Sequence, residues 1–328
     1  MPLADRIDWS VEPEGSLADL YTRRARALRD RFDYLILLYS GGSDSHQMLM
    51  AFLSAGIHVD EVCTICPMKW AESVDLSGGP DDSLGLLQEH HLAAVPGLRT
   101  VSLRSPKTKI TILDTTDAYS GDMEWPDGLF GARMSGGLHG LYQAVRRVRV
   151  ARDLQRRAER LRARVGVLIG ADKPFLRLRG RELTVHFDDC GRVGIEHFWQ
   201  HGSNLLYEPV MFYWGDPTIT CKQAHAIKKA LDVDPRLISN TEAHKRLIYP
   251  HWTGSYQRRQ PLCGDVLTAC VGERAAVIAA ERTRFYAQMF KGLSGIGRIT
   301  NEEPKIGTGT RVVLLARKTK SYRIGTLS

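Results

Sequence analysis

Along the first half of the chain, segments whose apolar residues have helical spacing alternate with short, unbroken apolar runs. Residues 16–32 place leucines and a tyrosine at helical spacing among arginines, which predicts an amphipathic helix. The unbroken apolar run 34–39 predicts a strand buried on both faces, as in a parallel sheet. Residues 44–55 return to helical spacing, and Gly56 predicts the end of that helix.

The pattern continues in the same alternating way through the middle of the chain. We expect further strands at 59–66, 99–103 and 167–169, a long helix at 138–165, a hairpin at 175–189 around Gly180, helices at 220–231 and 263–290, and a closing hairpin at 310–325. Strands that alternate with helices predict an α/β fold with a parallel, twisted sheet flanked by helices.

The second half of the chain has a less regular pattern than the first. We therefore expect a core at residues 1–172, including the N-terminal helix, followed by α+β additions at residues 173–328. These additions form either a separate accessory region or a continuation of one domain.

Composition narrows the class of protein. The 328 residues are 43% hydrophobic and 25% charged, which is typical of globular proteins. No apolar run approaches the roughly 18 residues of a membrane span, and the first residues lack the apolar centre of a signal peptide, so we expect a soluble, cytoplasmic protein. Six cysteines do not predict a disulfide scaffold. The net charge of +8 favours polyanionic partners.

The stretch SGGSDS, between the first predicted strand and the helix after it, has the composition of an anion-binding loop. Its residues are Ser40, Gly41, Gly42, Ser43, Asp44 and Ser45. Two glycines let backbone N–H groups approach a ligand, and a helix N-terminus attracts negative charge. The hydroxyls of the three serines add hydrogen-bond donors for such a ligand. Because a carboxylate is repelled by phosphate unless a cation lies between them, Asp44 indicates Mg²⁺. The alternative is a turn whose serine and aspartate only cap the helix.

This strand, loop and helix resemble the PP-loop of the ATP pyrophosphatase superfamily. That superfamily includes the synthetase domains of asparagine and GMP synthetases, tRNA-thiolating and lysidine-forming enzymes, and PAPS reductase-like proteins. The resemblance covers about residues 33–175 and implies a Rossmann-like HUP fold. It also implies that the loop holds the β,γ-pyrophosphate of ATP, that ATP is cleaved to AMP and pyrophosphate, and that an acceptor is adenylated. A phage-encoded branch of the superfamily shows similar motifs after residue 170.

The resemblance extends to two positions outside the loop. A Gly-x-Asp stretch after a later strand supplies a second Mg²⁺ ligand in the asparagine synthetase branch, which implies that role for Asp172. The adjacent Lys173 matches a phosphate-binding lysine of that branch. The end of the second strand lies against adenine in the family, which implies a contact from Ile65, Cys66 or Pro67, and we select Cys66. The alternative for Asp172 and Lys173 is a capped loop before Pro174.

Two outcomes of acceptor activation stay open. Attack by nitrogen makes an amide-forming or amidine-forming ligase, and attack by sulfur makes a thiolation or PAPS reductase-like enzyme. We favour nitrogen because Cys63 and Cys66, three apart in a predicted strand, indicate buried structural cysteines more than a sulfur relay. A non-catalytic nucleotide-binding module is the alternative of another class, although the intact loop argues against it.

The predicted helix at 138–165 carries a dense run of arginines. We expect Arg146, Arg149, Arg156 and Arg160 to lie away from its apolar stripe, where they form either a solvated face or a surface that binds the phosphates of nucleic acid. No aromatic stacking platform accompanies them, so base-specific readout is not implied.

Overall fold

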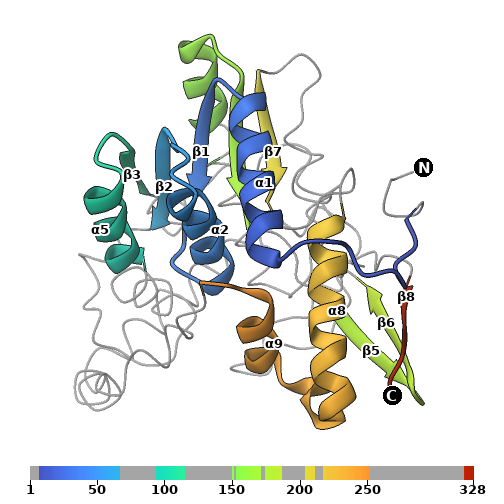
Figure 1. The fold of residues 1–328 in the computed structure, drawn as a ribbon. Coiled ribbons are helices and arrows are strands. Elements are labelled where there is room, and N and C mark those ends of the chain that lie inside the picture. The colour runs from blue at the N-terminus through green and yellow to red at the C-terminus, as the bar shows by residue number, and fades with distance from the viewer. Residues whose placement is uncertain are drawn as a thin grey trace, which may run out of the picture.

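A five-stranded parallel sheet forms the centre of the molecule (Figure 1). We describe it from a computed structural model, which describes residues 7–66, 94–114, 150, 153–170, 174–186, 204–210, 217–251 and 321–328. The strands are β1 (Tyr34–Leu38), β2 (Glu61–Cys66), β3 (Lys109–Asp114), β4 (Val165–Ile169) and β7 (Leu205–Pro209). Their spatial order is β3-β2-β1-β4-β7, and every neighbouring pair is parallel. The expected α/β class is confirmed.

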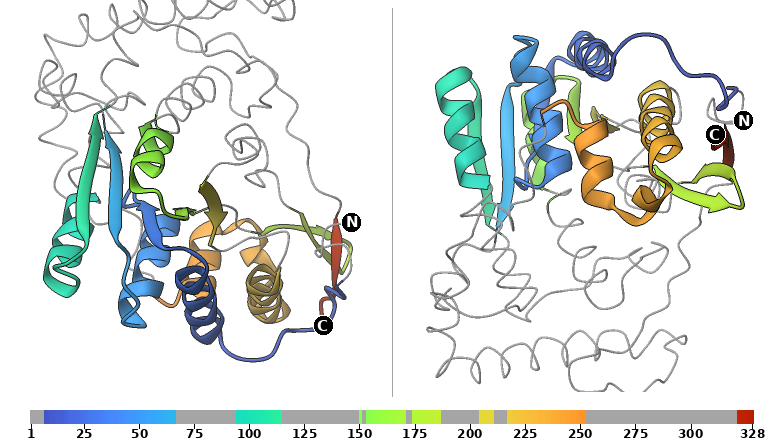
Figure 2. Two further views of the ribbon diagram at one scale, coloured as in Figure 1. Left: turned by 90° about the horizontal axis from the view of Figure 1, so that it is seen from above. Right: turned by 60° about the horizontal axis from the view of Figure 1, so that its bottom comes forward.

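Helices cover both faces of this sheet (Figure 2). The first face carries α1 (Leu17–Arg31), α2 (Ser43–Ser54) and α5 (Val95–Arg104), and the opposite face carries the helical residues 153–161. Side chains of a strand alternate between faces. Leu35 and Leu37 accordingly pack toward α1 and α2, whereas Ile36 packs toward Leu154 and Ala158. Burial on both faces explains the unbroken apolar run of β1.

The first two helices begin and end as their sequences predict. The side chain of Ser16 accepts a hydrogen bond from the backbone of Asp19, and the Asp19 carboxylate accepts one from the backbone of Ser16, so α1 starts in a capping box. After α2, Gly56 adopts a left-handed φ of +65°, which glycine tolerates best.

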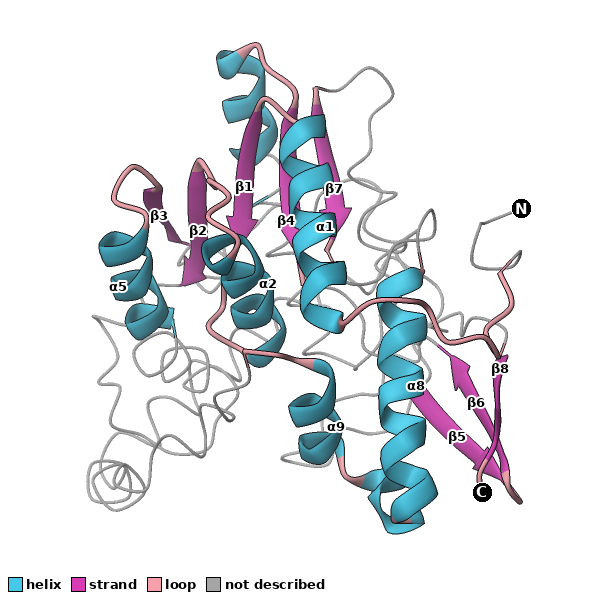
Figure 3. Cartoon of the chain, viewed as in Figure 1, coloured by secondary structure: helices cyan, strands magenta, loops and turns pink. Residues whose placement is uncertain are grey.

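A second, three-stranded antiparallel sheet lies beside the first (Figure 3). Its order is β5 (Phe175–Arg179), β6 (Glu182–His186) and β8 (Tyr322–Thr326), and it packs with α8 (Thr218–Val233), the 3₁₀ helix η5 (Pro235–Ser239) and α9 (Thr241–Ile248). The hairpin expected around Gly180 is confirmed. One apolar cluster joins this sheet to Trp9, to Tyr21 of α1 and to Ala51 of α2, so the second sheet packs with helices that cover the first face of the central sheet.

Two sequence predictions of secondary structure are wrong. Residues 99–103 belong to α5 rather than to a strand, because Leu98 and Val101 are buried at helical spacing while Leu103 is 83% exposed. The third strand is β3, ten residues later. The long helix also ends earlier than residue 165, since Arg162 has a left-handed φ of +51° and β4 already begins at Val165. Residues 138–149 and the helix expected at 263–290 lie outside the described residues.

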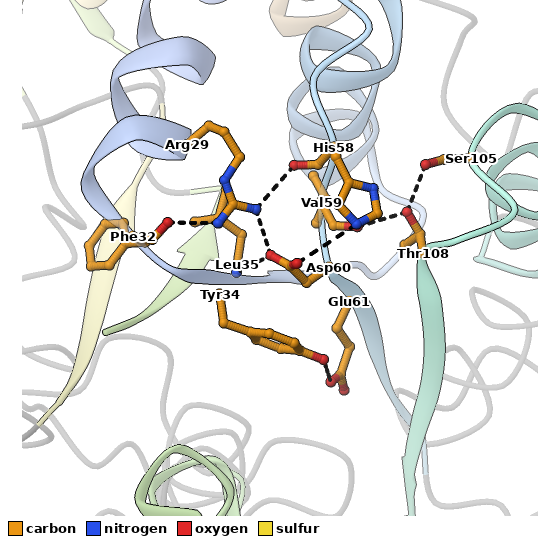
Figure 4. Close-up of polar contacts among 10 residues, drawn as sticks. All are labelled: Arg29, Phe32, Tyr34, Leu35, His58, Val59, Asp60, Glu61, Ser105 and Thr108. Carbon is orange, nitrogen blue, oxygen red and sulfur yellow. Dashed lines mark hydrogen bonds and ion pairs between the residues drawn. The ribbon is translucent and has the colours of Figure 1, made fainter. Parts of the chain in front are cut away.

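Ion pairs attach helices of both faces to the sheet at the start of β2, and Figure 4 shows the pair between Arg29 and Asp60. Asp60, just before β2, accepts hydrogen bonds from the Arg29 guanidinium at 2.5 Å and from the backbone N–H of Leu35 at 2.7 Å. Glu61 is fully buried and pairs with Arg157 from the opposite face. Burial favours a higher pKa for Glu61, but Arg157, Thr111 and Lys109 together hold it below its usual range.

Within the described part of the chain, no helix is long and apolar enough to span a bilayer.

Candidate anion-binding site at the end of the central strand

Residues 40–45 connect β1 to α2 at the carboxyl edge of the parallel sheet. Tyr39 still follows the sheet, since its N–H donates to the carbonyl of Cys63 at 2.8 Å. Gly41 then takes a left-handed φ of +83°, and Gly42 is the N-cap of α2. The chain therefore reverses from strand to helix within three residues, at a position that only glycine occupies without strain.

Four hydrogen bonds close the loop on itself. The Gly42 N–H donates to the Ser40 hydroxyl at 3.2 Å, and the Ser45 hydroxyl donates to the Gly42 carbonyl at 3.1 Å. The Ser40 N–H donates to the Ser45 hydroxyl at 3.3 Å. Because Ser45 has one hydroxyl hydrogen, Ser40 is the donor in the 3.2 Å bond between the two serines. Both hydroxyls, which the sequence suggested as ligand donors, thus shape the loop in this structure.

The helix that follows begins without a side-chain cap. Its N-cap is Gly42, which has no side chain to accept from the first turn, and Ser43 and Asp44 occupy the first two helical positions. The first turn of any helix carries N–H groups that lack intrahelical partners and a positive dipole end. The alternative that serine and aspartate merely cap α2 is therefore not what the structure shows.

The order of the strands places this loop at a topological switch point. From β1 the chain passes to β2 and β3 on one side, and it later returns to β4 and β7 on the other side of β1. In open α/β sheets, ligands bind outside the carboxyl ends of the strands at such a reversal. Gly170, which follows β4, lies against the loop: a β-carbon there would be 3.3 Å from the Asp44 Cβ and from the Ser45 backbone nitrogen.

A buried tyrosine supports the loop from the side of α5. The Tyr39 side chain is 2% exposed, and its hydroxyl lies 3.1 Å from the His46 Nδ1 in the first turns of α2. The ring fits because Gly97 of α5 has no side chain, since a β-carbon at that position would be 1.8 Å from the Tyr39 hydroxyl oxygen. Tyr39, His46 and Gly97 were not singled out from the sequence, and no local motif marks them.

A second tyrosine reaches the loop from far along the chain. The Tyr249 hydroxyl, just after α9, donates to the Asp44 Oδ1 at 2.6 Å. The next contact in the same segment is a 3.1 Å hydrogen bond from the His251 backbone N–H to the Gln47 Oε1. Helix α9, which leads to these contacts, lies between α2 and α8 (Figures 1 and 2). Sequence reasoning missed Tyr249 because its partner is 205 residues away.

The remaining predicted site residues are only partly placed. Asp172 and Lys173 lie outside the described residues, two and three positions after Gly170, so their roles stay predictions. Cys66 ends β2 and pairs in register with Asp114 of β3, while the position of its side chain is outside the description. Within the described residues, no group of three or more histidine, cysteine, aspartate or glutamate side chains is arranged to hold a metal ion.

The described cysteines are buried thiols. Cys63 is fully buried, as its position in a strand predicted, and burial raises its pKa to about 12. Cys221 of α8 is 1% exposed, and burial raises its pKa to about 12 as well. Thiols with such pKa values are protonated at neutral pH and are poor nucleophiles.

The arginine-rich helix uses one of its charges inside the fold, where Arg157 pairs with buried Glu61. At the surface, Arg156 lies 3.8 Å from Asp153, and Arg164, just after the helix, lies 2.8 Å from Asp33. Arg160 is exposed. Arg146 and Arg149 lie outside the described residues, so the predicted phosphate-binding surface is represented here by Arg156 and Arg160 alone.

Comparison with known proteins adds no family to this description. No protein-family model matches the chain, and no curated protein matches it.

Proposed function

We propose that residues 40–45 bind the triphosphate of ATP with Mg²⁺, and that the chain cleaves ATP to AMP and pyrophosphate while it adenylates an acceptor. The observation that carries this proposal is the uncapped start of α2 directly after the left-handed Gly41, at the switch point of a parallel sheet. A PP-loop of the HUP type has this combination of loop, helix and strand order.

The residues of the loop suit this nucleotide and this metal. Mg²⁺ in nucleotide sites is typically held by one or two carboxylates together with the substrate phosphates, so it does not require a cluster of protein ligands. Asp44 would supply such a carboxylate, and Asp172 a second one. Bound Mg²⁺ would offset the repulsion between these carboxylates and the phosphates and would stabilise charge on the departing pyrophosphate. Lys173 would contact phosphate, and Cys66 would lie near adenine.

The backbone and side-chain groups of the loop would contribute mainly by holding the phosphates in place. The N–H groups at the start of α2 would donate to phosphate oxygens, and the Gly41 backbone leaves that approach open. The ring of hydrogen bonds through Ser40 and Ser45 keeps the loop in one conformation before the ligand arrives. Preorganised donors of this kind stabilise developing negative charge without reorganisation during the reaction.

Nitrogen transfer is the second step that we propose. The nitrogen of ammonia or of an amine attacks the adenylated carbon of the acceptor, the bond from that carbon to the AMP oxygen breaks, and AMP leaves, which makes the chain an amide-forming or amidine-forming ligase or transferase. The buried state of Cys63 favours this choice over sulfur transfer, since a thiol with a pKa of about 12 does not serve a persulfide relay. The acceptor that we propose is a nucleotide or nucleic acid, with Arg146, Arg149, Arg156 and Arg160 as phosphate contacts.

Incubation of the protein with Mg²⁺ and ATP labelled at the α-phosphate tests the first step. We expect labelled AMP, stimulated by an acceptor, and equimolar pyrophosphate. Labelled ADP would contradict the proposal, and binding of ATP with no AMP in the presence of nucleic acid and ammonia would make the chain a binding module.

Substitution of Asp44 tests the site. Asp44→Ala should abolish AMP formation, and Asp44→Asn, which keeps an acceptor for the Tyr249 hydroxyl, should also lose it because the charge is absent. Asp30→Ala removes an exposed carboxylate of α1 and serves as the matched control. Wild-type turnover in both Asp44 variants would show that this carboxylate has no role in the chemistry.

A further inference from the structure

The segment that follows α9 is built into the start of α2. Tyr249 is 1% exposed, so its hydroxyl is a buried polar group that needs a partner. Its partner is the Asp44 Oδ1, at 2.6 Å. The backbone on both sides is fixed too, because the Ile248 carbonyl accepts from the Tyr21 hydroxyl at 3.3 Å and the His251 N–H donates to Gln47 at 3.1 Å.

These bonds connect the C-terminal half of the chain to the loop in a fixed geometry. Tyr21 of α1 also accepts a 2.7 Å hydrogen bond from the Gln223 side chain of α8. Helices α1 and α8 therefore hold Ile248, and Ile248 holds the adjacent tyrosine. The Tyr249 ring has little freedom, so the direction of its hydroxyl toward Asp44 is set by the fold rather than by a mobile side chain.

We propose that Tyr249 is a positioning residue for the metal-binding carboxylate of Asp44. This inference rests on the proposed function, because it assigns Tyr249 a role toward the metal–nucleotide complex. A carboxylate oxygen has more than one lone pair, so Oδ1 can accept from Tyr249 while the same carboxylate ligates a cation. Tyr249 thus fixes the rotation of the carboxylate, and the accessory helices become part of the nucleotide site.

The expected loss of metal affinity can be taken from other proteins in which a residue that hydrogen-bonds to a metal ligand has been replaced. Loss of a hydrogen bond that orients a ligand typically weakens metal binding about 10–100-fold. Tyr249→Phe removes this hydrogen bond and keeps the ring that fills the core. We therefore expect Tyr249→Phe to fold and to bind the metal–nucleotide complex about 10–100-fold more weakly than wild type.

Tyr34→Phe is a matched control. The Tyr34 hydroxyl also donates to a carboxylate, the Glu61 Oε2 at 3.1 Å, yet Tyr34 begins β1, at the end of that strand away from residues 40–45. The Tyr21 hydroxyl is unsuitable for this comparison because it bonds to Ile248 and so helps to hold Tyr249. A purely structural contribution of a hydroxyl bonded to a carboxylate should affect both variants alike.

The experiment measures Mn²⁺ binding, by electron paramagnetic resonance, to full-length protein with the non-cleavable analogue α,β-methylene-ATP. Thermal unfolding of each variant is recorded in parallel. We expect a large shift of the Mn²⁺ midpoint in Tyr249→Phe and little shift in Tyr34→Phe, at similar stabilities. Equal midpoints for wild type and Tyr249→Phe would overturn the inference, as would equal shifts in the two variants.

The outcomes separate this inference from the proposed reaction. Wild-type protein that binds the Mn²⁺ complex and forms no AMP from ATP would overturn the chemistry, while the midpoint comparison would still decide the role of Tyr249. Wild-type protein that does not bind the complex would overturn both. AMP formation together with unshifted midpoints would overturn the Tyr249 role alone.

Discussion

Substitution of Gly97 by alanine tests how tightly α5 packs against Tyr39, the residue that precedes the loop at residues 40–45. Gly97 lies in the first turn of α5, where its backbone faces the ring of Tyr39. An alanine β-carbon would lie 1.8 Å from the Tyr39 hydroxyl oxygen, 2.4 Å from Cζ and 2.6 Å from Cε1. An ordinary contact begins at 3.4 Å, so the oxygen would have to retreat by 3.4 − 1.8 = 1.6 Å.

Two opposing effects decide the sign of the change in stability. Alanine is a better helix former than glycine by at most ~1 kcal/mol. Overpacking of a core costs ~1–3 kcal/mol, and contact with three ring atoms at once lies at the upper end of that range. Tyr39 is 2% exposed and cannot swing into solvent. We therefore expect Gly97→Ala to lower the free energy of unfolding by about 2 kcal/mol.

Urea unfolding of Gly97→Ala, followed by circular dichroism, measures this change. Arg99→Ala, at an exposed position of the same helix, is a control in which the new alanine meets no core side chain. The double variant Gly97→Ala with Tyr39→Leu should recover part of the loss caused by Gly97→Ala, because it removes the ring. Two results would refute the reasoning that Gly97 is needed to make room for the Tyr39 ring. The first is a Gly97→Ala variant as stable as wild type. The second is a double variant whose loss of unfolding free energy equals the sum of the losses in the two single variants.

Three further predictions concern other parts of the fold. Glu208→Gln should destabilise the protein by about 2–3 kcal/mol in urea unfolding, because this 2% exposed side chain accepts from two arginines of α1. Asp234→Asn should change little, because the Arg236 side chain that pairs with Asp234 is 91% exposed. Two lysines of α8 lower the pKa of Glu12 to about 2, so the stability it adds is complete above pH 4.5 and is lost as the pH falls toward 2; Glu12→Gln should flatten acid unfolding over that range, and an unchanged profile would contradict this. Cys63→Ser combined with Cys66→Ser should retain AMP formation at reduced stability, and loss of AMP formation in a folded variant would favour sulfur transfer.

Local spacing was sufficient to predict the elements that lead into the site. The apolar run of β1 and the helical spacing of α1 and α2 are properties of contiguous residues, and the structure confirms all three elements. The motif at residues 40–45 was equally visible because two adjacent glycines and an acidic residue are rare between such elements.

Prediction failed where a short segment owes its structure to distant partners. Val101 and Leu103 alternate like a strand, yet burial selects Leu98 and Val101 and leaves Leu103 exposed, so the segment is helical. Strand β7 was not predicted from the sequence. Its Glu208 is tolerated only because Arg24 and Arg31 of α1 lie across from it.

Three parts of the fold that are distant in sequence converge on residues 40–45. Gly97 of α5 makes room for Tyr39, Gly170 after β4 lies against Asp44, and Tyr249 after α9 bonds to the Asp44 carboxylate. A turn that only connects a strand to a helix does not need this support, and loops of that kind normally tolerate variation. Glycine within a helix reduces stability, and a buried tyrosine hydroxyl requires a dedicated partner. Such features are expected where a binding loop must keep its shape before the ligand arrives, because rigidity lowers the entropy lost on binding.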